Sequence, residues 1–79
     1  MIKNECDVSA TINNIYMIMY EKELTEAGLA RELNTSRQAL HNQLNKRNTM
    51  PKLEWLYPIS EILDTPLSEL IILRPKEDL

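Results

Sequence analysis

The side chains of this sequence that are best suited to recognising a ligand by hydrogen bonds lie in one short segment. Four polar residues of this segment are spaced so that an α-helix would place them on one face: Arg37, Gln38, His41 and Asn42. Arginine forks onto the two acceptors of a guanine edge, and glutamine or asparagine forms two hydrogen bonds with adenine. We interpret this face as reading base edges. The alternative is a solvated helix face, which usually carries Glu and Lys, and residues 37–45 contain neither.

Polar groups on either side of this segment suit other roles. Thr35 and Ser36 offer hydroxyls and backbone amides to a phosphate at the N-terminus of the expected helix. Ser36 can equally cap that helix, and the two roles are compatible. After the segment, residues 46–49 contain no apolar side chain and indicate a solvated loop.

The sequence offers no arrangement typical of catalysis or of metal binding. One His and one Cys exclude a His pair and a multi-Cys metal site, and one Gly excludes a glycine-rich phosphate loop. Ser36 and His41 would lie on an exposed helix without an oxyanion hole, so they do not form a triad with a carboxylate. We therefore expect a binding protein and not an enzyme, with no metal and no cofactor.

The composition is that of one small domain. The 79 residues are 43% hydrophobic and 27% charged, which is typical of globular proteins. The lone Cys6 favours a reduced thiol in a cytoplasmic protein. The longest apolar run has six residues, too few for a signal peptide or a membrane span, so we expect no membrane contact. A core this thin also favours an oligomer on grounds of stability.

The net charge of −3 is unevenly distributed along the chain. Residues 25–52 contain five basic and two acidic residues, a net charge of +3, whereas residues 1–24 and 53–79 carry −2 and −4. A basic centre between acidic flanks is consistent with one positive face that meets a polyanion. Ordinary scatter of charge accounts for the pattern equally well.

The chain is expected to be all helix, because Gly is nearly absent and no apolar–polar alternation lasts long enough for a strand. We expect a loose N-terminal arm over residues 1–8, a single domain over residues 9–74 and a polar tail over residues 75–79. Cap signals and apolar spacing predict five helices, at about 9–23, 26–33, 37–45, 51–63 and 66–73. Pro58 predicts a kink or a restart within the fourth of them.

The spacing of apolar and capping residues from Leu24 to Leu70 follows a known pattern. Its first half, L-T-Q-x-x-L-A-x-x-L-G-V-S-x-x-x-I, is matched by Leu24, Thr25, Leu29, Ala30, Leu33, Ser36 and Leu40. Its second half, P-x-L-x-x-L-x-x-I-x-x-x-L-x-x-x-L-x-x-L, is matched by Pro51, Leu53, Leu56, Ile59, Leu63, Leu67 and Leu70. In these 47 of 79 residues the chain resembles the Cro/cI-type helix-turn-helix family, also called the XRE family.

The resemblance implies an all-α, five-helix, lambda-repressor-like helix-turn-helix domain whose third helix enters the major groove of DNA. Ala30 would then lie where the second and third helices cross. The resemblance also implies phosphate contacts along the loop after the third helix, by Lys46, Arg47, Asn48 and Lys52. Several positions depart from the pattern, among them Asn34, which replaces a turn glycine, Gln43, which stands where an apolar residue is common, and Glu26, which replaces a glutamine whose amide donates to a phosphate. A carboxylate would repel that phosphate, which leaves the effect of Glu26 on DNA affinity open.

Taken together, these features predict a sequence-specific transcriptional regulator that binds double-stranded DNA, similar to Cro-like repressors of phages and mobile elements. One such domain contacts few base pairs, so we expect a homodimer on a palindromic operator with half-sites about 34 Å apart. The fifth helix has more apolar residues than one inward face can use, which places the dimer interface at Leu67, Ile71, Ile72 and Leu73.

The apolar surface of the first expected helix is also wider than one core-facing stripe. Tyr16, Met17 and Tyr20 would be buried there by the N-terminal arm or by a partner protein. Two alternative functions follow from this surface and from Glu26. One is the antitoxin of a toxin–antitoxin pair, which would hold the toxin on this helix. The other is a protein-interaction module that has lost DNA binding.

Overall fold

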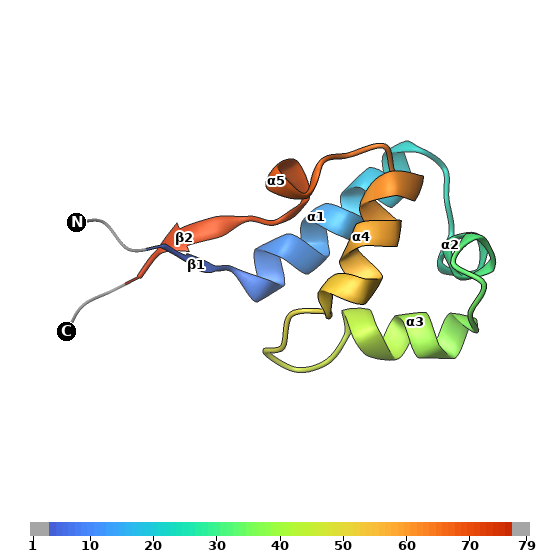
Figure 1. Cartoon of the computed structure of the whole chain (residues 1–79), viewed down its shortest axis with the longest axis horizontal. Helices are drawn as coiled ribbons and strands as arrows, with labels where there is room; N and C mark the ends of the chain where they lie inside the picture. Colours follow the sequence, from blue (N-terminus) through green and yellow to red (C-terminus); the bar gives the residue numbers. More distant parts are fainter. Residues whose placement is uncertain (1–3, 77–79) are drawn as a thin grey trace.

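The computed structural model describes residues 4–76 and contains five helices and two short strands in that range. In chain order they are β1 (Asn4–Cys6), α1 (Val8–Glu21), α2 (Glu26–Glu32), α3 (Arg37–Leu44), α4 (Leu53–Ile62), α5 (Leu67–Leu70) and β2 (Leu73–Pro75). The helices form the body of the molecule, and the strand pair projects from one end of its long axis (Figure 1). None of the helices in the described range is long and apolar enough to cross a membrane.

Side-chain caps fix where three of the helices begin. Asp7 Oδ1, Thr25 Oγ1 and Ser36 Oγ each accept a hydrogen bond from the backbone N–H three residues later, at 3.0, 3.0 and 3.1 Å. Each bond satisfies one of the free N–H groups at a helix start. Capping by Ser36, which the sequence indicates, is thus confirmed.

Three helices are followed, two positions after their last residue, by a residue in the left-handed backbone region. These residues are Glu23, Asn34 and Asp64, with φ angles of 55°, 59° and 51°. In each case the N–H of the next residue donates to the carbonyl five positions before it, at 2.8 to 3.0 Å. This arrangement satisfies carbonyls that the helix end leaves free. Asparagine tolerates the left-handed region, so Asn34 keeps the sharp turn between α2 and α3 where the family pattern has glycine.

The core lies between the five helices, and every helix contributes to it. Ten apolar side chains are at most 2% exposed: Ile15, Met19, Leu29, Ala30, Leu40, Leu44, Leu56, Ile59, Leu63 and Leu70. Burying a large aliphatic side chain stabilises a fold by roughly 1.5–3 kcal/mol. Helices α2 and α3 contact each other and supply Leu29, Ala30, Leu40 and Leu44 to this core.

Helix α4 continues through Pro58 without a break, so the helix does not restart at this residue, and the alternative of a kink stays a prediction. Proline removes one backbone hydrogen bond, to the carbonyl four residues earlier. That carbonyl belongs to Glu54, an exposed residue in the first turn of the helix. Water can solvate an exposed carbonyl, which makes the lost bond tolerable at this position.

The two strands form an antiparallel pair that joins the two ends of the described chain. The register pairs Asn4 with Pro75, Glu5 with Arg74 and Cys6 with Leu73. Arg74 Nε also donates to Glu5 Oε1 at 3.2 Å across the pair. The backbone N–H of Asp7 donates to the carbonyl of Ile72 at 2.8 Å, which ties the strand pair to the start of α1.

This pairing corrects three expectations. The chain is not entirely helical, because a small sheet accompanies the five helices. The arm expected over residues 1–8 is a paired strand at residues 4–6, while residues 1–3 lie outside the described range. The expected polar tail begins with Pro75 inside β2. Strands of three residues show no alternation, and their partners lie about seventy positions apart, so sequence periodicity gives no signal for them.

Helix α5 ends at Leu70, so the expectation of a helix to residue 73 is wrong. The backbone of Ile72 bonds to α1, because its N–H donates to Thr11 Oγ1 at 2.9 Å. Asn14 Nδ2 donates to the carbonyls of Glu69 and Leu70, both at 3.0 Å. These bonds from α1 occupy the N–H of Ile72 and the carbonyls of Glu69 and Leu70, which a longer α5 would need for its own backbone hydrogen bonds. The chain therefore leaves α5 in an extended conformation.

Candidate nucleic-acid interface

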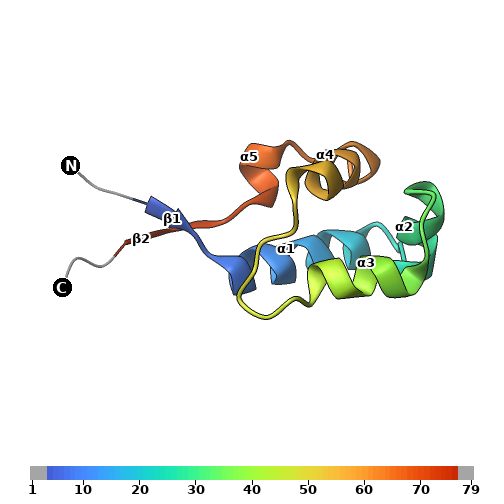
Figure 2. The same cartoon turned by 60° about the horizontal axis from the view of Figure 1, so that its bottom comes forward.

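Helix α3 has one buried face and one exposed face. Leu40 and Leu44 are 0% and 1% exposed and hold the helix against the core. The four residues expected to read bases are all exposed: Arg37, Gln38, His41 and Asn42. Helix α3 runs along one edge of the body, which Figure 2 turns toward the viewer. The structure therefore brings the predicted readers together on one accessible surface.

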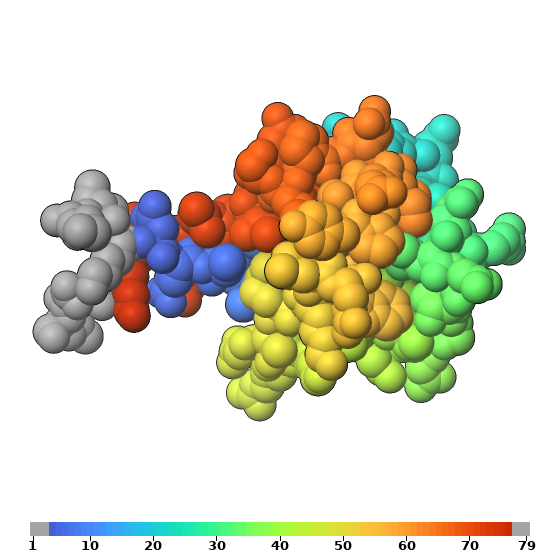
Figure 3. All heavy atoms as spheres, viewed as in Figure 1, coloured from blue at the N-terminus to red at the C-terminus, as the bar shows by residue number. Residues whose placement is uncertain are grey.

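The residues expected to contact phosphates lie at both ends of α3. Ser36 is exposed at the helix start, and Thr35 is half-buried beside it. The loop after α3 continues the same edge of the molecule (Figure 3), and its candidates Lys46, Arg47 and Asn48 are exposed. Pro51 is buried and holds the end of this loop to the body.

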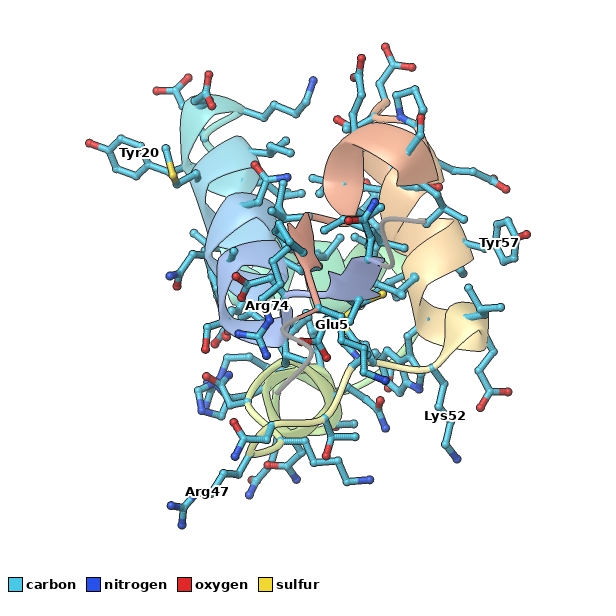
Figure 4. All side chains as sticks on the ribbon, turned by 90° about the vertical axis from the view of Figure 1, so that its left-hand side faces the viewer. Glu5, Tyr20, Arg47, Lys52, Tyr57 and Arg74 are labelled. Carbon is cyan, nitrogen blue, oxygen red and sulfur yellow. The ribbon has the colours of Figure 1, made fainter. Side chains whose placement is uncertain are left out.

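Lys52 differs from the rest of this loop in the direction it takes. In Figure 4 the side chains of Arg47 and Lys52 leave the body on different sides of the end of α3. Lys52 Nζ lies 4.0 Å from Glu54 Oε1, and both side chains are mostly exposed. An exposed pair at this distance holds its partners only weakly. Lys46, Arg47 and Asn48 are consecutive exposed residues of the loop, and Lys52 points away from Arg47.

The structure ties two of the four predicted readers to Glu26. Arg37 Nη1 lies 3.3 Å from Glu26 Oε1, and His41 Nδ1 lies 3.0 Å from Glu26 Oε2. The Tyr16 hydroxyl donates to the same carboxylate, and Asn45 Nδ2 donates to the Tyr16 hydroxyl at 3.0 Å. We call these five residues the Glu26 cluster. It joins α1, α2 and α3 by side-chain hydrogen bonds next to the exposed face of α3.

The electrostatics of the cluster fix which groups donate and which accept. Burial raises the pKa of Glu26, but bonds from Tyr16, His41 and Arg37 and the charge of His41 outweigh it, so the net pKa lies below the ordinary 4.5. Burial and the bond to Glu26 raise the pKa of Tyr16 above 10.0, against a smaller opposite effect of Asn45. At neutral pH the carboxylate therefore only accepts, and the phenol remains a donor.

Comparisons with protein-family models, with curated proteins and with solved structures found no match to this chain. The function is therefore inferred from the residues and their geometry.

Sequence reasoning did not anticipate the Glu26 cluster. It placed Glu26 beside a DNA phosphate and assigned Tyr16 to contacts with the arm or a partner. One signal was present: a carboxylate at the start of α2 faces two cationic residue types four positions apart on α3. The contact with Tyr16 has no such signal, because it depends on how α1 packs. Within residues 4–76, no three His, Cys, Asp or Glu side chains are grouped so as to hold a metal ion.

An open apolar groove adjoins the cluster on the side of α1. Its volume is about 750 Å³, and Tyr16 and Glu26 line it together with Met17, Tyr20 and Leu24. Met17 is 63% exposed and Tyr20 is 85% exposed, and Figure 4 shows Tyr20 pointing away from the body. β1 lies at the far end of α1 (Figure 1), so residues 4–6 of the expected arm do not cover these side chains.

The lowered pKa of Glu26 predicts a specific pH dependence of stability. A carboxyl group whose pKa is depressed by folding stabilises the native state above its unfolded pKa, and this contribution is lost as the pH falls through the folded pKa. Between pH 6 and pH 3, the free energy of unfolding should therefore fall more steeply for the wild type than for Glu26→Gln. Urea unfolding followed by circular dichroism at each pH measures the difference. The exposed, same-helix control Glu32→Gln should keep the wild-type slope, and equal slopes for wild type and Glu26→Gln would contradict the prediction.

Proposed function

We propose that this protein binds double-stranded DNA in a sequence-specific manner, with α3 in the major groove. The observation that carries the proposal is the exposed face of α3. It has four polar side chains able to read base edges, backed by fully buried leucines and followed by an exposed basic loop. The major groove of B-DNA is about 12 Å wide and admits one α-helix. The short turn between α2 and α3 supports the finer assignment to a lambda-repressor-like helix-turn-helix.

The role that best suits such binding is regulation of transcription as a Cro-like repressor, which the spacing from Leu24 to Leu70 favours. Selection of bound sites from a pool of random duplexes tests the DNA-binding proposal directly. A recovered consensus sequence would support it, and its symmetry would show whether two copies bind together. Recovery of unenriched sequence at about 50 mM salt, where phosphate contacts are strongest, would contradict it.

The loop residues should act on every duplex alike. If Lys46 and Arg47 neutralise phosphates, Lys46→Ala and Arg47→Ala should weaken preferred and scrambled duplexes by similar factors. Each should also make the dependence of log affinity on log salt shallower, by about 0.9 for each phosphate that a subunit no longer neutralises. Binding isotherms at three salt concentrations measure this slope. Lys22→Ala, at an exposed position after α1 and outside α3 and its loop, is the matched loss of charge and should leave the slope unchanged.

Two copies are proposed to bind one operator, because a single α3 reads too few base pairs. Of the residues assigned to the dimer interface, Leu67 and Ile71 pack partly against their own core, and Ile72 is half-buried. Leu73 is 56% exposed in β2 and remains available to a second copy. The interface would therefore involve the extended chain after α5.

Sedimentation should reveal a dimer at about 100 μM, with or without DNA, and Leu73→Asp should shift it toward monomer. Leu53→Asp is the matched control, because Leu53 is also 56% exposed but lies at the start of α4. A wild type that stays monomeric in both conditions would contradict the proposed dimer. Equal effects of the two substitutions would contradict the assignment to Leu73.

A second candidate function, binding of a protein partner, is favoured by the groove beside α1. Met17 and Tyr20 are exposed there, and the groove lining contains two carboxylates and no basic residue. This chemistry suits an amphipathic segment with apolar anchors and basic flanks, such as a toxin partner would need to supply. Co-purification from the source, lost in Tyr20→Glu, would support this function. Duplex selection that fails while such a complex forms would favour it over DNA binding.

A further inference from the structure

We propose that Glu26 determines the specificity of DNA recognition by positioning Arg37 and His41, and that it does so at the expense of affinity. The inference rests on the proposed function, because it assigns a role within the same interface. Glu26 differs from the readers themselves, since it acts through two other side chains. The carboxylate that the sequence marks as an obstacle to DNA binding thereby becomes part of the reading apparatus.

The geometry first constrains Arg37. Its Nη1 is bonded to Glu26 Oε1 at 3.3 Å, while the side chain as a whole is 58% exposed. The Nε–H and the second Nη group then remain available as a pair of donors on the other edge of the guanidinium. Two donors held in one plane are what the acceptors of a guanine edge require. Without Glu26, the long arginine side chain has more conformations available, and fixing one of them costs entropy on binding.

The same carboxylate also fixes His41. An ionised carboxylate cannot donate, so the His41 Nδ1 that faces Glu26 carries the hydrogen. The other ring nitrogen, Nε2, then lies on the side of the ring away from Glu26 and can accept a hydrogen bond. The His41 side chain is 49% exposed. The ring orientation and the position of its proton are thereby set before DNA arrives. A ring that could exchange the two nitrogens would offer either a donor or an acceptor to the same base.

Glu26 is itself held firmly enough to serve as such a support. Tyr16 from α1 donates to it, and Asn45 Nδ2 at the end of α3 donates to the Tyr16 hydroxyl and, at 2.9 Å, to the carbonyl of His41. The Glu26 side chain is only 19% exposed, so it moves less freely than a surface glutamate. Three helices therefore hold the carboxylate in place at the base of the reading face.

The negative charge of Glu26 is the reason why we expect this residue to lower the affinity for DNA. Glu26 adds a negative charge beside the face that would approach the phosphates of DNA, and it offsets the positive charge of Arg37. Removing that charge should strengthen binding to any duplex. Removing the support should weaken the distinction between duplexes. The two effects have opposite signs, so they can be separated in one experiment.

Glu26→Gln tests the proposal on the full chain, with affinities for the selected duplex and for a scrambled duplex measured by fluorescence anisotropy. We expect affinity for the scrambled duplex to rise several-fold, and the ratio of the two affinities to fall by about tenfold. Glu32→Gln removes the same charge from an exposed position on α2, outside the cluster, and should leave the ratio unchanged. Tyr16→Phe removes one bond that holds Glu26 and keeps the charge, so it should lower the ratio by less than Glu26→Gln does, without the rise in affinity for the scrambled duplex.

An unchanged ratio in Glu26→Gln, or the same loss of ratio in Glu32→Gln, would overturn the proposal while leaving specific DNA binding intact. A wild type that does not distinguish the duplexes would overturn both the proposed function and this role. Long-range nitrogen–proton spectra of the His41 ring provide a readout without DNA. The wild type should carry the proton of neutral His41 on Nδ1, and Glu26→Gln should shift it toward Nε2. The same tautomer in both proteins would overturn the positioning of His41.

Discussion

Replacing Arg37 with alanine should cost about 1–3 kcal/mol in binding to the preferred duplex, a loss of roughly 5- to 150-fold in affinity. The physical reason is the loss of two donors from a reading face where their acceptors on the base would remain unpaired. The preference at one base-pair position should relax, while binding to scrambled duplexes should fall much less. Competition isotherms with single-position variants of the selected site measure both quantities.

Two controls separate reading from simple loss of charge. Arg47→Ala removes a cation from the loop and should weaken all duplexes by similar factors, whereas Lys22→Ala, at an exposed position after α1, should change neither affinity nor preference. Because Arg37 is bonded to Glu26, the substitution also leaves that carboxylate with one donor fewer. The measurement is therefore repeated in the Glu26→Gln background, where the two changes should be non-additive. Equal losses on preferred and scrambled duplexes would mean that Arg37 does not read a base.

Replacing Ala30 with leucine should lower the free energy of unfolding by about 1–3 kcal/mol. Ala30 is 2% exposed in α2, the helix that packs against α3, so we expect the larger side chain to press on the residues around it. Its carbonyl also accepts the bond from Thr35 N, at 2.9 Å, that closes the turn between these helices. A displacement there would move α3 relative to the core, so DNA affinity should fall together with stability.

Ala27→Leu provides the matched control, because Ala27 is exposed on the same helix. It adds the same atoms where solvent accommodates them, and its stability should stay within about 0.5 kcal/mol of the wild type. Urea unfolding followed by circular dichroism measures both variants. A fully stable Ala30→Leu protein would indicate that α2 and α3 can separate without cost, which the packing around Ala30 does not favour.

Local signals in the sequence were sufficient for much of the helical framework. Thr25 and Ser36 cap the helices that they were expected to cap, and Asn34 takes the left-handed conformation where the turn requires it. Leu40, which matches the apolar spacing, is buried in α3 together with Leu44, and Arg37 and His41 lie on the exposed face. These features depend on hydrogen bonds and side-chain periods within one turn of helix, and such interactions are encoded by neighbouring residues.

Long-range interactions decided the rest. α5 ends at Leu70 because Thr11 and Asn14, more than fifty positions earlier in the chain, bond to the backbone around that point. β1 and β2 pair because the fold brings residues 4–6 and 73–75 side by side. Neither interaction leaves a pattern in the local sequence, since hydrogen bonds between distant segments have no fixed spacing along the chain.

The local sequence thus determined which residues line the candidate interface. The tertiary structure decided which of their side chains are held by hydrogen bonds. The period of α3 alone places Arg37, Gln38, His41 and Asn42 on one face. Whether these side chains are free or held depends on where the start of α2 and the middle of α1 come to lie beside them. The fold brings Tyr16 and Glu26 to that position, and a half-buried carboxylate then attracts the nearest donors, because few water molecules remain to compete for it.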